Sequence, residues 1–274
     1  MKNTIPQILI GTFQVNTQED MDKIVCAAVE SKNYAFDTAP SYGSEKMLGN
    51  SLMKLIKNGI ISRENLYLQD KIDAIQMYYC EKVGIYDFVQ SQLSLLNTEY
   101  LDSLLVHWPF RKYFIETWKC MQELKEEGII KQVGVCNLDV MGYQEIFVQN
   151  NLIQPDIIQN EISPLNTDRN ATDFFIKHGI YIEAYSPLCR MDSRIKENIR
   201  IKSIADAHSV DVARVVLKWH IQKNISPIFT SKKAERIVSN TKLDFELQPD
   251  EIDFIDSLNE NYKIFPISHG CPGY

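Results

Sequence analysis

Several features that mark large classes of proteins are missing from this 274-residue chain. Its six cysteines form no C-x-x-C pair, which argues against a disulfide scaffold and favours a reduced, cytosolic protein. No apolar run approaches the roughly 18 residues that a membrane-spanning helix needs. Residues 1–6 also lack the apolar core of a signal peptide. We therefore expect a cytoplasmic protein that does not interact with membranes.

Two further classes are excluded by charge and by histidine spacing. The net charge of −7 is spread along the chain and the basic residues form no long run, so we expect no nucleic-acid partner. Short metal-ligand spacing is absent among the histidines, so we expect no metal site. These histidines are His107, His178, His208, His220 and His269. A G-x-G-x-x-G sequence is also absent, so nothing indicates a Rossmann dinucleotide site.

Short apolar runs of strand length alternate along the chain with longer segments of helical period. The predicted strands are residues 7–13, 34–37, 66–69, 101–106, 132–136, 156–159, 180–185 and 227–229. The predicted helices are residues 19–32, 44–58, 79–96, 115–127, 140–149, 168–178, 201–223 with an interruption near Ser209, a helix starting near Ala234, and 250–259. Eight strands that alternate with helices pair in parallel. The pattern therefore predicts an α/β fold, a (β/α)8 TIM barrel that forms a single domain over residues 1–274.

Ionisable residues stand at or just after the ends of three predicted strands. Asp37 ends the second strand and Tyr42 follows it, Lys71 comes after the third strand, and His107 comes after the fourth. Because functional residues of such barrels lie at the carboxyl ends of the strands, we expect these four side chains to converge. Taken singly, each has a structural interpretation: a loop tyrosine, a solvated Lys–Asp pair and a buried core histidine.

Together, these four residues have the chemistry of proton transfer to a carbonyl oxygen. A free tyrosine has a pKa near 10, and a cationic Lys71 beside Tyr42 is expected to lower that pKa. Asp37 would hold Lys71 in place, and His107 would hydrogen-bond the carbonyl oxygen. The hydride for a reduction has to come from a cofactor, since no side chain supplies it.

The chain resembles the aldo-keto reductases over nearly its whole length. The matching stretches share order and spacing with that family, and they are residues 9–13 (LIGTF), 36–39 (FDTA), 42–45 (YGSE), 106–109 (VHWP), 134–137 (GVCN), 159–164 (QNEISP), 184–188 (AYSPL) and 216–220 (VLKWH). The resemblance implies a catalytic tetrad of Asp37, Tyr42, Lys71 and His107. It also implies the use of a nicotinamide dinucleotide without a Rossmann motif, and the chain is most similar to bacterial members of the diketogluconate reductase type.

The resemblance also places the cofactor contacts. It implies that Asn137 and Gln159 hold the nicotinamide carboxamide, that Tyr185 stacks on the nicotinamide ring, and that Ser186 and Leu188 lie along the pyrophosphate. The other cofactor contacts that it implies are Gly11, Thr12, Phe13, Ser231, Arg236 and Asn240. Cys136 stands where the family commonly has serine, and Ser239 where it usually has glutamate.

One departure from the family concerns the choice of cofactor. The family's Ile-Pro-Lys-Ser stretch is Ile228-Phe229-Thr230-Ser231 here, so Thr230 replaces a lysine that helps neutralise the 2′-phosphate of NADP. Arg236 matches an arginine that contacts the same phosphate, and an arginine–phosphate contact is charge-assisted and bidentate. We therefore expect NADP(H), with NAD(H) as the alternative.

The expected partner is a small-molecule carbonyl substrate. Phe13, Trp108 and Phe110 would form an aromatic wall of the substrate pocket. Arg111 and Lys112 either begin a solvated helix or attract an acidic substrate, and residues 265–274 either fold over the pocket or form a disordered end. The expected product is an alcohol and the expected assembly a monomer or weak dimer. The alternative function is a non-catalytic, cofactor-binding regulatory or structural protein of the same fold.

Overall fold

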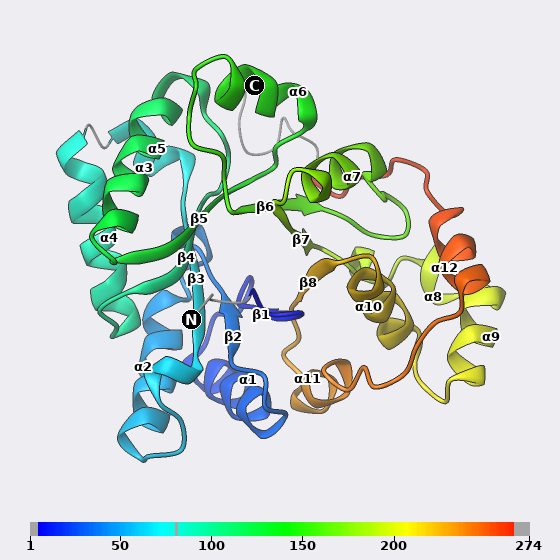
Figure 1. Ribbon diagram of the computed structural model, residues 1–274. Helices are drawn as coiled ribbons and strands as arrows, with labels where there is room; N and C mark the ends of the chain where they lie inside the picture. The colour runs from blue at the N-terminus through cyan, green and yellow to red at the C-terminus, as the bar shows by residue number, and fades with distance from the viewer. Residues whose placement is uncertain (1–4, 80–81, 266–274) are drawn as a thin grey trace.

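The computed structural model describes residues 5–79 and 82–265, and its strands form a closed parallel barrel in which neighbours in sequence are neighbours in space. The barrel closes where β8 pairs with β1. The strands are β1 (Leu9–Gly11), β2 (Ala35–Asp37), β3 (Tyr67–Ile72), β4 (Leu101–Val106), β5 (Ile130–Cys136), β6 (Ile157–Glu161), β7 (Tyr181–Tyr185) and β8 (Ile225–Phe229). Figure 1 shows the helices arranged around these strands, and the predicted (β/α)8 barrel is thus confirmed.

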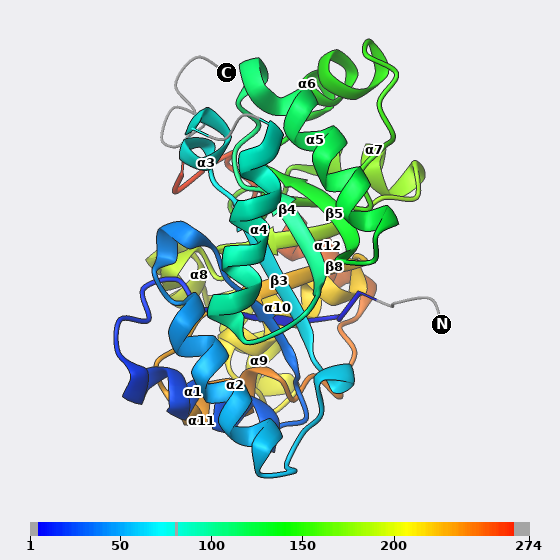
Figure 2. The same cartoon turned by 90° about the vertical axis from the view of Figure 1, so that its left-hand side faces the viewer.

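The α-helices cover the outside of the barrel, as the turned view in Figure 2 also shows for α2, α4 and α5. They are α1 (Gln18–Glu30), α2 (Glu45–Lys57), α3 (Ala74–Tyr79), α4 (Lys82–Leu96), α5 (Arg111–Glu126), α6 (Val140–Tyr143), α7 (Arg169–Lys177), α8 (Ser193–Lys196), α9 (Ile199–Ala207), α10 (Val212–Gln222), α11 (Ala234–Asn240) and α12 (Pro249–Asp256). Short helical turns of other types are η1 (Pro40–Tyr42), η2 (Arg63–Asn65), η3 (Gln144–Val148, a π-helix that continues α6) and η4 (Cys189–Met191).

Local signals account for the ends of several helices. The Thr17 hydroxyl accepts a hydrogen bond from the Asp20 N–H and caps the start of α1. Gly128 and Gly179 follow α5 and α7 with φ of 77° and 73°, left-handed values that favour glycine and stop a helix. The predicted interruption near Ser209 is confirmed, because α9 ends at Ala207, α10 begins at Val212 and Ser209 has a φ of 53°.

Several elements differ from the sequence prediction. The third strand runs on to Ile72 instead of ending at Gln69, because Asp70–Ile72 pair with Leu104–Val106 of β4. The first strand is shorter than predicted, since Gln14 takes a left-handed φ of 62° in the turn that follows it. The helix predicted over residues 79–96 is α4, which begins at Lys82, and the short helix α3 before it was not predicted.

Side chains alternate along each strand between two environments. Phe36, Leu68 and Leu104 point outward into the main apolar core beneath the helices. Leu9, Ala35, Tyr67 and Ile228 form a separate apolar cluster inside the barrel. On the same inward-facing sides of these strands, polar and charged residues lie nearer the carboxyl ends. The half of the barrel interior at the carboxyl ends is therefore largely polar. That polar interior lies directly beneath the predicted site.

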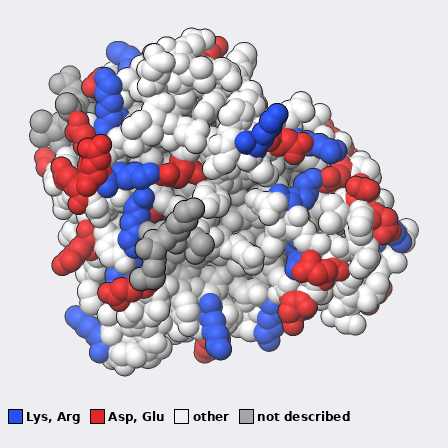
Figure 3. Space-filling view, in the orientation of Figure 1, with Lys and Arg blue, Asp and Glu red and all other residues white. Residues whose placement is uncertain are grey.

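The outer surface carries charges of both signs. On the face shown in Figure 3, lysine and arginine side chains lie beside aspartate and glutamate side chains. Within residues 5–79 and 82–265, none of the helices combines the length and the apolar character needed to cross a bilayer.

Candidate active site

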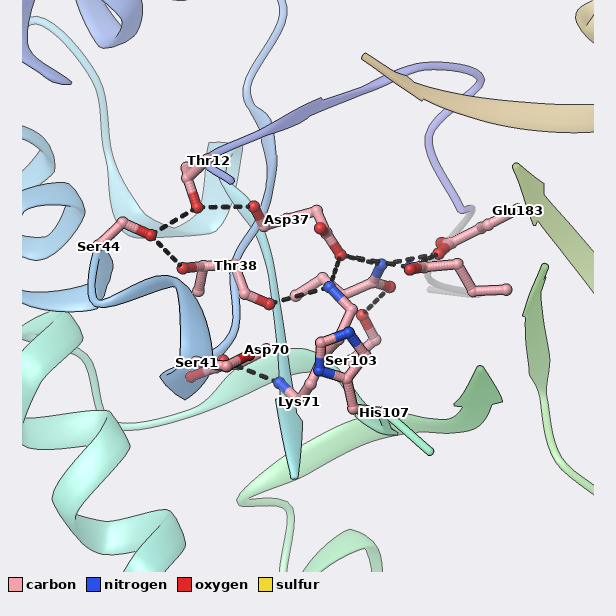
Figure 4. A network of polar contacts seen from close by, with 12 residues as sticks. Thr12, Asp37, Thr38, Ser41, Ser44, Asp70, Lys71, Ser103, His107 and Glu183 are labelled. Atoms are coloured by element: carbon pink, nitrogen blue, oxygen red, sulfur yellow. Dashed lines mark hydrogen bonds and ion pairs between the residues drawn. The ribbon is translucent and has the colours of Figure 1, made fainter. Parts of the chain in front are cut away.

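A buried ion pair joins the second and third strands. Lys71 donates from Nζ to Asp37 Oδ1 at 2.5 Å and to the Thr38 carbonyl at 3.0 Å, and the lysine side chain is fully buried. Burial alone would lower the pKa of Lys71, but the Asp37 carboxylate outweighs it and raises that pKa above its ordinary value. Lys71 is therefore a cation at neutral pH. In Figure 4 it reaches toward Asp37 from β3.

Tyr42 lies above this ion pair on the short turn η1. Pro40 starts the turn, and Gly43 ends it in a left-handed conformation with a φ of 64°. The Tyr42 ring centroid is 5.0 Å from Lys71 Nζ and 5.7 Å from the His107 ring, which it meets edge-on. The structure therefore brings together all four residues that the sequence predicted to converge.

The expected lowering of the Tyr42 pKa is wrong as a net effect. Burial raises the pKa of Tyr42 above its ordinary value, and the Lys71 charge lowers it only in part. At neutral pH the phenol thus keeps its proton, as a proton donor must. Lys71 favours the phenolate that remains once the proton has left.

His107 follows β4 and is held on three sides. Its backbone N–H donates to the Ile72 carbonyl at 2.9 Å, and its own carbonyl accepts from Asn137 Nδ2 at 3.0 Å. Its ring nitrogen Nδ1 makes a short contact with the Asp73 carboxylate. Asp73 was not among the predicted site residues. It accepts two further hydrogen bonds, from the Ser41 N–H at 2.8 Å and from the Ser41 hydroxyl at 3.3 Å.

A second polar layer fills the barrel beneath the ion pair. Gln69 Nε2 donates to Asp37 Oδ1 at 2.9 Å and to Glu183 Oε2 at 2.7 Å. Gln159 Nε2 donates to the same two oxygens, at 3.3 Å and 2.9 Å. The Ser103 hydroxyl donates to the Gln69 side-chain amide oxygen Oε1 at 2.6 Å. Figure 4 shows Glu183 on one side of Asp37, with Thr12 and Ser44 on the other.

Glu183 is the buried acid of this layer, and no lysine, arginine or histidine of the described residues forms an ion pair with it. Its Oε1 is buried without a hydrogen-bond partner in the described part of the chain. Burial raises the pKa of Glu183 to about 7, although the hydrogen bonds from Gln159 and Gln69 oppose that shift. The carboxyl group therefore changes its charge near neutral pH.

A cavity of about 1160 Å³ opens over these residues at the carboxyl ends of the strands. The predicted site residues that line it are Gly11, Phe13, Asp37, Tyr42, His107, Trp108, Asn137, Gln159, Tyr185, Ser186, Leu188, Ser231, Arg236 and Asn240. Thr230 and Cys136 line it as well, and burial raises the pKa of the Cys136 thiol, which therefore stays neutral.

Three predicted residues do not line the cavity. Lys71 lies beneath its floor and acts through its contacts. Thr12 is fully buried, and its hydroxyl donates to the Asp37 carbonyl at 3.0 Å and contacts the Ser44 hydroxyl at 2.8 Å. Phe110 was expected in the substrate pocket, but its ring stacks on Tyr113 with centroids 5.7 Å apart. Thr12 and Phe110 are thus the predicted cofactor and pocket residues that do not line this cavity.

Two other expectations concern residues beside the cavity. Arg111 pairs with Glu145 at 2.6 Å on the outside of the barrel and does not line the cavity, as expected for the exposed start of α5. Lys112 is also exposed, with Nζ 5.1 Å from the Tyr113 ring centroid. Of the tail 265–274, only Phe265 is described. It lines the cavity, and residues 266–274 lie outside the described part of the chain.

One end of the cavity has the donors and acceptors that a carboxamide requires. Both Gln159 Nε2 hydrogens are used by Asp37 and Glu183, so its carbonyl oxygen is left as an acceptor. Asn137 Nδ2 uses one hydrogen on the His107 carbonyl and keeps a second donor. The Tyr185 hydroxyl donates to Asn137 Oδ1 at 2.7 Å, which fixes the orientation of that amide. This donor and acceptor pair fits the carboxamide of a nicotinamide.

The other end of the cavity is rich in cationic side chains. Lys232 and Arg236 are exposed there, and Asn240 is buried at its wall. Gly11 lies against the same region, where an added Cβ would come within 2.7 Å of Thr230 Oγ1. A polyanionic group fits this end. The two ends together suit a nicotinamide dinucleotide with its phosphates.

Sequence reasoning missed three groups of site residues. Gln69 and Asp73 lie two residues before and two residues after Lys71, and Glu183 lies two residues before Tyr185. Because side chains two residues apart on a strand point to the same side, these residues lie on the same side of their strands as predicted site residues. This alternation is the sequence signal that could have identified them. Arg190 and Lys196 also line the cavity, but no strand period marks them because they belong to η4 and α8.

Comparison with known proteins gives one consistent result. The model of the aldo/keto reductase family matches residues 7–260. The glyoxal reductase of Bacillus subtilis (strain 168) is 30% identical over 263 residues, which are 96% of this chain and 92% of the relative. The methylglyoxal reductase DkgA of Escherichia coli O157:H7 is 30% identical over 267 residues, covering 96% and 93%. Among solved structures, a Bombyx mori aldo-keto reductase in complex with NADP aligns with a TM-score of 0.89 and 27% identity, covering 97% of this chain and 93% of the other.

Proposed function

The chain belongs to the aldo/keto reductase family, and from this premise we propose that it reduces a small aldehyde or ketone to an alcohol with NADPH. It would be an NAD(P)H-dependent oxidoreductase of the diketogluconate reductase type. The observation that carries the proposal is the buried Lys71–Asp37 ion pair beneath Tyr42, with His107 beside the same phenol. This arrangement supplies a proton where a carbonyl oxygen would enter the cavity.

The proposed roles follow from the contacts. When bound, NADPH supplies the hydride that adds to the carbonyl carbon. Tyr42 gives its phenolic proton to the carbonyl oxygen, so that the C=O double bond becomes an alcohol. Lys71 stabilises the phenolate that this leaves, and Asp37 keeps Lys71 charged and in place. Solvent then returns a proton to Tyr42. His107 orients the carbonyl oxygen.

The cofactor would lie along the whole cavity. Gln159 and Asn137 would hold its carboxamide and Tyr185 would stack on its ring. Gly11, Phe13, Ser186 and Leu188 would line its middle. Ser231, Arg236 and Asn240 would bind the adenosine end. Arg236 favours NADPH through its charge, whereas Thr230 in place of a lysine and the Asp211 carboxylate in the same wall favour NADH as the alternative.

Small dicarbonyl compounds are the substrate class that we propose. Phe13 and Trp108 supply apolar cavity wall, and the Phe13 ring meets Tyr42 edge-on at 5.1 Å. The relatives named above as glyoxal and methylglyoxal reductases act on compounds of this size. A short substrate would reach Tyr42 without needing further contacts with the cavity wall.

The test of this function is the Tyr42→Phe variant. We expect its kcat for glyoxal and methylglyoxal reduction to fall about 10²- to 10⁴-fold, the usual contribution of a positioned acid. NADPH binding, followed by protein fluorescence, should stay within about twofold, since the ring that lines the cavity is kept. Wild-type rates in the variant would show that Tyr42 is not the acid. NADPH binding by the wild-type chain without turnover on any carbonyl of a panel would instead favour the non-catalytic alternative.

A further inference from the structure

The contact between His107 and Asp73 adds a carboxylate to the site. Asp73 comes directly after β3, two residues beyond Lys71, and one of its carboxylate oxygens meets His107 Nδ1. Both side chains are largely buried, at 11% and 16% exposure. The Ser41 N–H and hydroxyl hold the carboxylate in place, and Ser41 precedes Tyr42. Asp73 thus contacts His107 and the residue before Tyr42.

The Asp73 carboxylate is ionised in this environment. Burial alone would raise the pKa of Asp73, but the hydrogen bonds from His107 and Ser41 outweigh it and lower that pKa below its ordinary value. An ionised carboxylate accepts hydrogen bonds and donates none. His107 Nδ1 therefore has to carry a hydrogen and donate it to Asp73.

This placement of the hydrogen has a consequence for the other ring nitrogen. A neutral imidazole has one N–H, so with Nδ1 protonated its Nε2 has only a lone pair. A lone pair cannot donate a hydrogen bond to a carbonyl oxygen. Nε2 becomes a donor only when the ring holds both protons and is positively charged.

The other groups around His107 do not replace Asp73 in this role. Tyr42 on η1 presents the edge of a neutral phenol, and Cys136 at the end of β5 is a neutral thiol. The Lys71 cation is directed to Asp37. Glu45 at the start of α2 interacts electrostatically with Asp73, and burial raises the pKa of Glu45. Among the described residues, Asp73 is the ionised carboxylate in contact with the ring.

We propose that Asp73 is a positioning residue that fixes the hydrogen of His107 on Nδ1 and stabilises the doubly protonated ring, so that carbonyl reduction requires a charged His107–Asp73 pair. The inference rests on the proposed carbonyl reduction, in which His107 contacts the substrate oxygen. A charged donor at that oxygen would stabilise the negative charge that develops there more strongly than a neutral one.

The first test needs no turnover. The protein is labelled with ¹⁵N-histidine, and the shifts of Nδ1 and Nε2 are followed from pH 5 to 9, with His107→Gln identifying the His107 signals. We expect the neutral ring to carry its hydrogen on Nδ1. A neutral ring with its hydrogen on Nε2 would overturn the proposal. If the wild-type chain reduced no carbonyl at all, the proposed function alone would fail and this measurement would still decide the state of the ring.

The second test asks whether Asp73 acts through His107. Asp73→Asn keeps the size of the side chain and removes its charge. We expect kcat/KM at pH 8 to fall roughly 10- to 100-fold, as when a hydrogen bond to a charged group is weakened.

A double-mutant cycle completes this test. The amide that His107→Gln introduces donates a hydrogen bond without titrating, so we expect Asp73→Asn to change kcat/KM less than about twofold in that background. An equal loss with or without His107 would overturn the proposal. NADPH affinity, measured on all four proteins, reports whether the variants are folded. If Asp73→Asn did not fold, the ring measurement on the wild-type protein would still decide the proposal.

Discussion

The two ends of the cavity are built differently. At the end that holds Tyr42, the proposed proton-donating end, Asp37 accepts hydrogen bonds from Lys71, Gln69 and Gln159, which come from two other strands. At the cationic end, Arg236 is exposed, and within the described residues its guanidinium group makes no hydrogen bond or ion pair. Ser231 there contacts its own segment, with its hydroxyl 3.4 Å from the Lys233 carbonyl.

The difference shows which positions the fold constrains. A change at Asp37 or Lys71 leaves a buried charge without its partner, so the barrel itself restricts those residues. A change at Thr230 alters an exposed side chain and leaves the strands intact. It is at this exposed end that the sequence departs from the family's Ile-Pro-Lys-Ser pattern. We therefore expect that substitutions at this end can change the preference of the proposed cofactor site without loss of the fold.

Lys71→Met should have the largest effect on stability. The variant leaves Asp37 buried without its cation, and we expect the free energy of unfolding to fall by about 3–5 kcal/mol. Urea unfolding at pH 7 measures this. The double variant Asp37→Asn/Lys71→Met should recover part of the loss, since it removes both charges. If Lys71→Met alone were as stable as the wild type, the proton-donating end would not be constrained in the way its contacts indicate.

Glu183→Gln should have an effect that depends on pH. The pKa of Glu183 in the folded state is raised to about 7 from an ordinary value of 4.5, so folding favours its protonated form. The wild-type protein then keeps its full stability below pH 4.5 and loses about 3 kcal/mol as the pH rises through 7. Glutamine mimics the protonated acid. We expect the two proteins to match at pH 4.5 and the variant to be more stable at pH 8.

The measurement for Glu183 is urea unfolding at both pH values. A difference between the two proteins that stays constant with pH would mean that the pKa of Glu183 is the same in the folded and unfolded states. A wild-type protein that is the more stable at pH 8 would contradict the burial of an unpaired carboxyl.

Arg236→Ala should affect neither fold nor chemistry. We expect the Kd for NADPH to rise roughly 10-fold, the loss of one charge-assisted contact, with the Kd for NADH changed less than about twofold. Thr230→Lys is the matched change in the opposite direction and should tighten NADPH binding a few-fold. Fluorescence titration of both cofactors measures this. An unchanged preference in Arg236→Ala would place the 2′-phosphate elsewhere or indicate NADH as the cofactor.

Strand alternation made much of the site predictable. Asp37, Lys71 and His107 follow apolar strand-like runs, and residues at such positions meet at the carboxyl end of a barrel. Gln69, Asp73 and Glu183 lie on the same side of their strands as predicted site residues. Their residue types alone, however, do not indicate a particular reaction, so the sequence offers no reason to select them. Their contacts across the barrel join residues up to 114 positions apart, which no local pattern reveals.

The sequence by itself determined the order of strands and helices, because hydrophobic period and helix-ending glycines are local properties. It also determined that Asp37, Tyr42, Lys71 and His107 lie at one end of the barrel. Only the tertiary structure decided how those groups are charged and oriented. Burial outweighs Lys71 at Tyr42, Asp73 meets His107, and Gln159 turns its carbonyl oxygen to the cavity because Asp37 and Glu183 take its hydrogens. Charge and orientation depend on burial and on partners from distant strands, and closure of the barrel sets both.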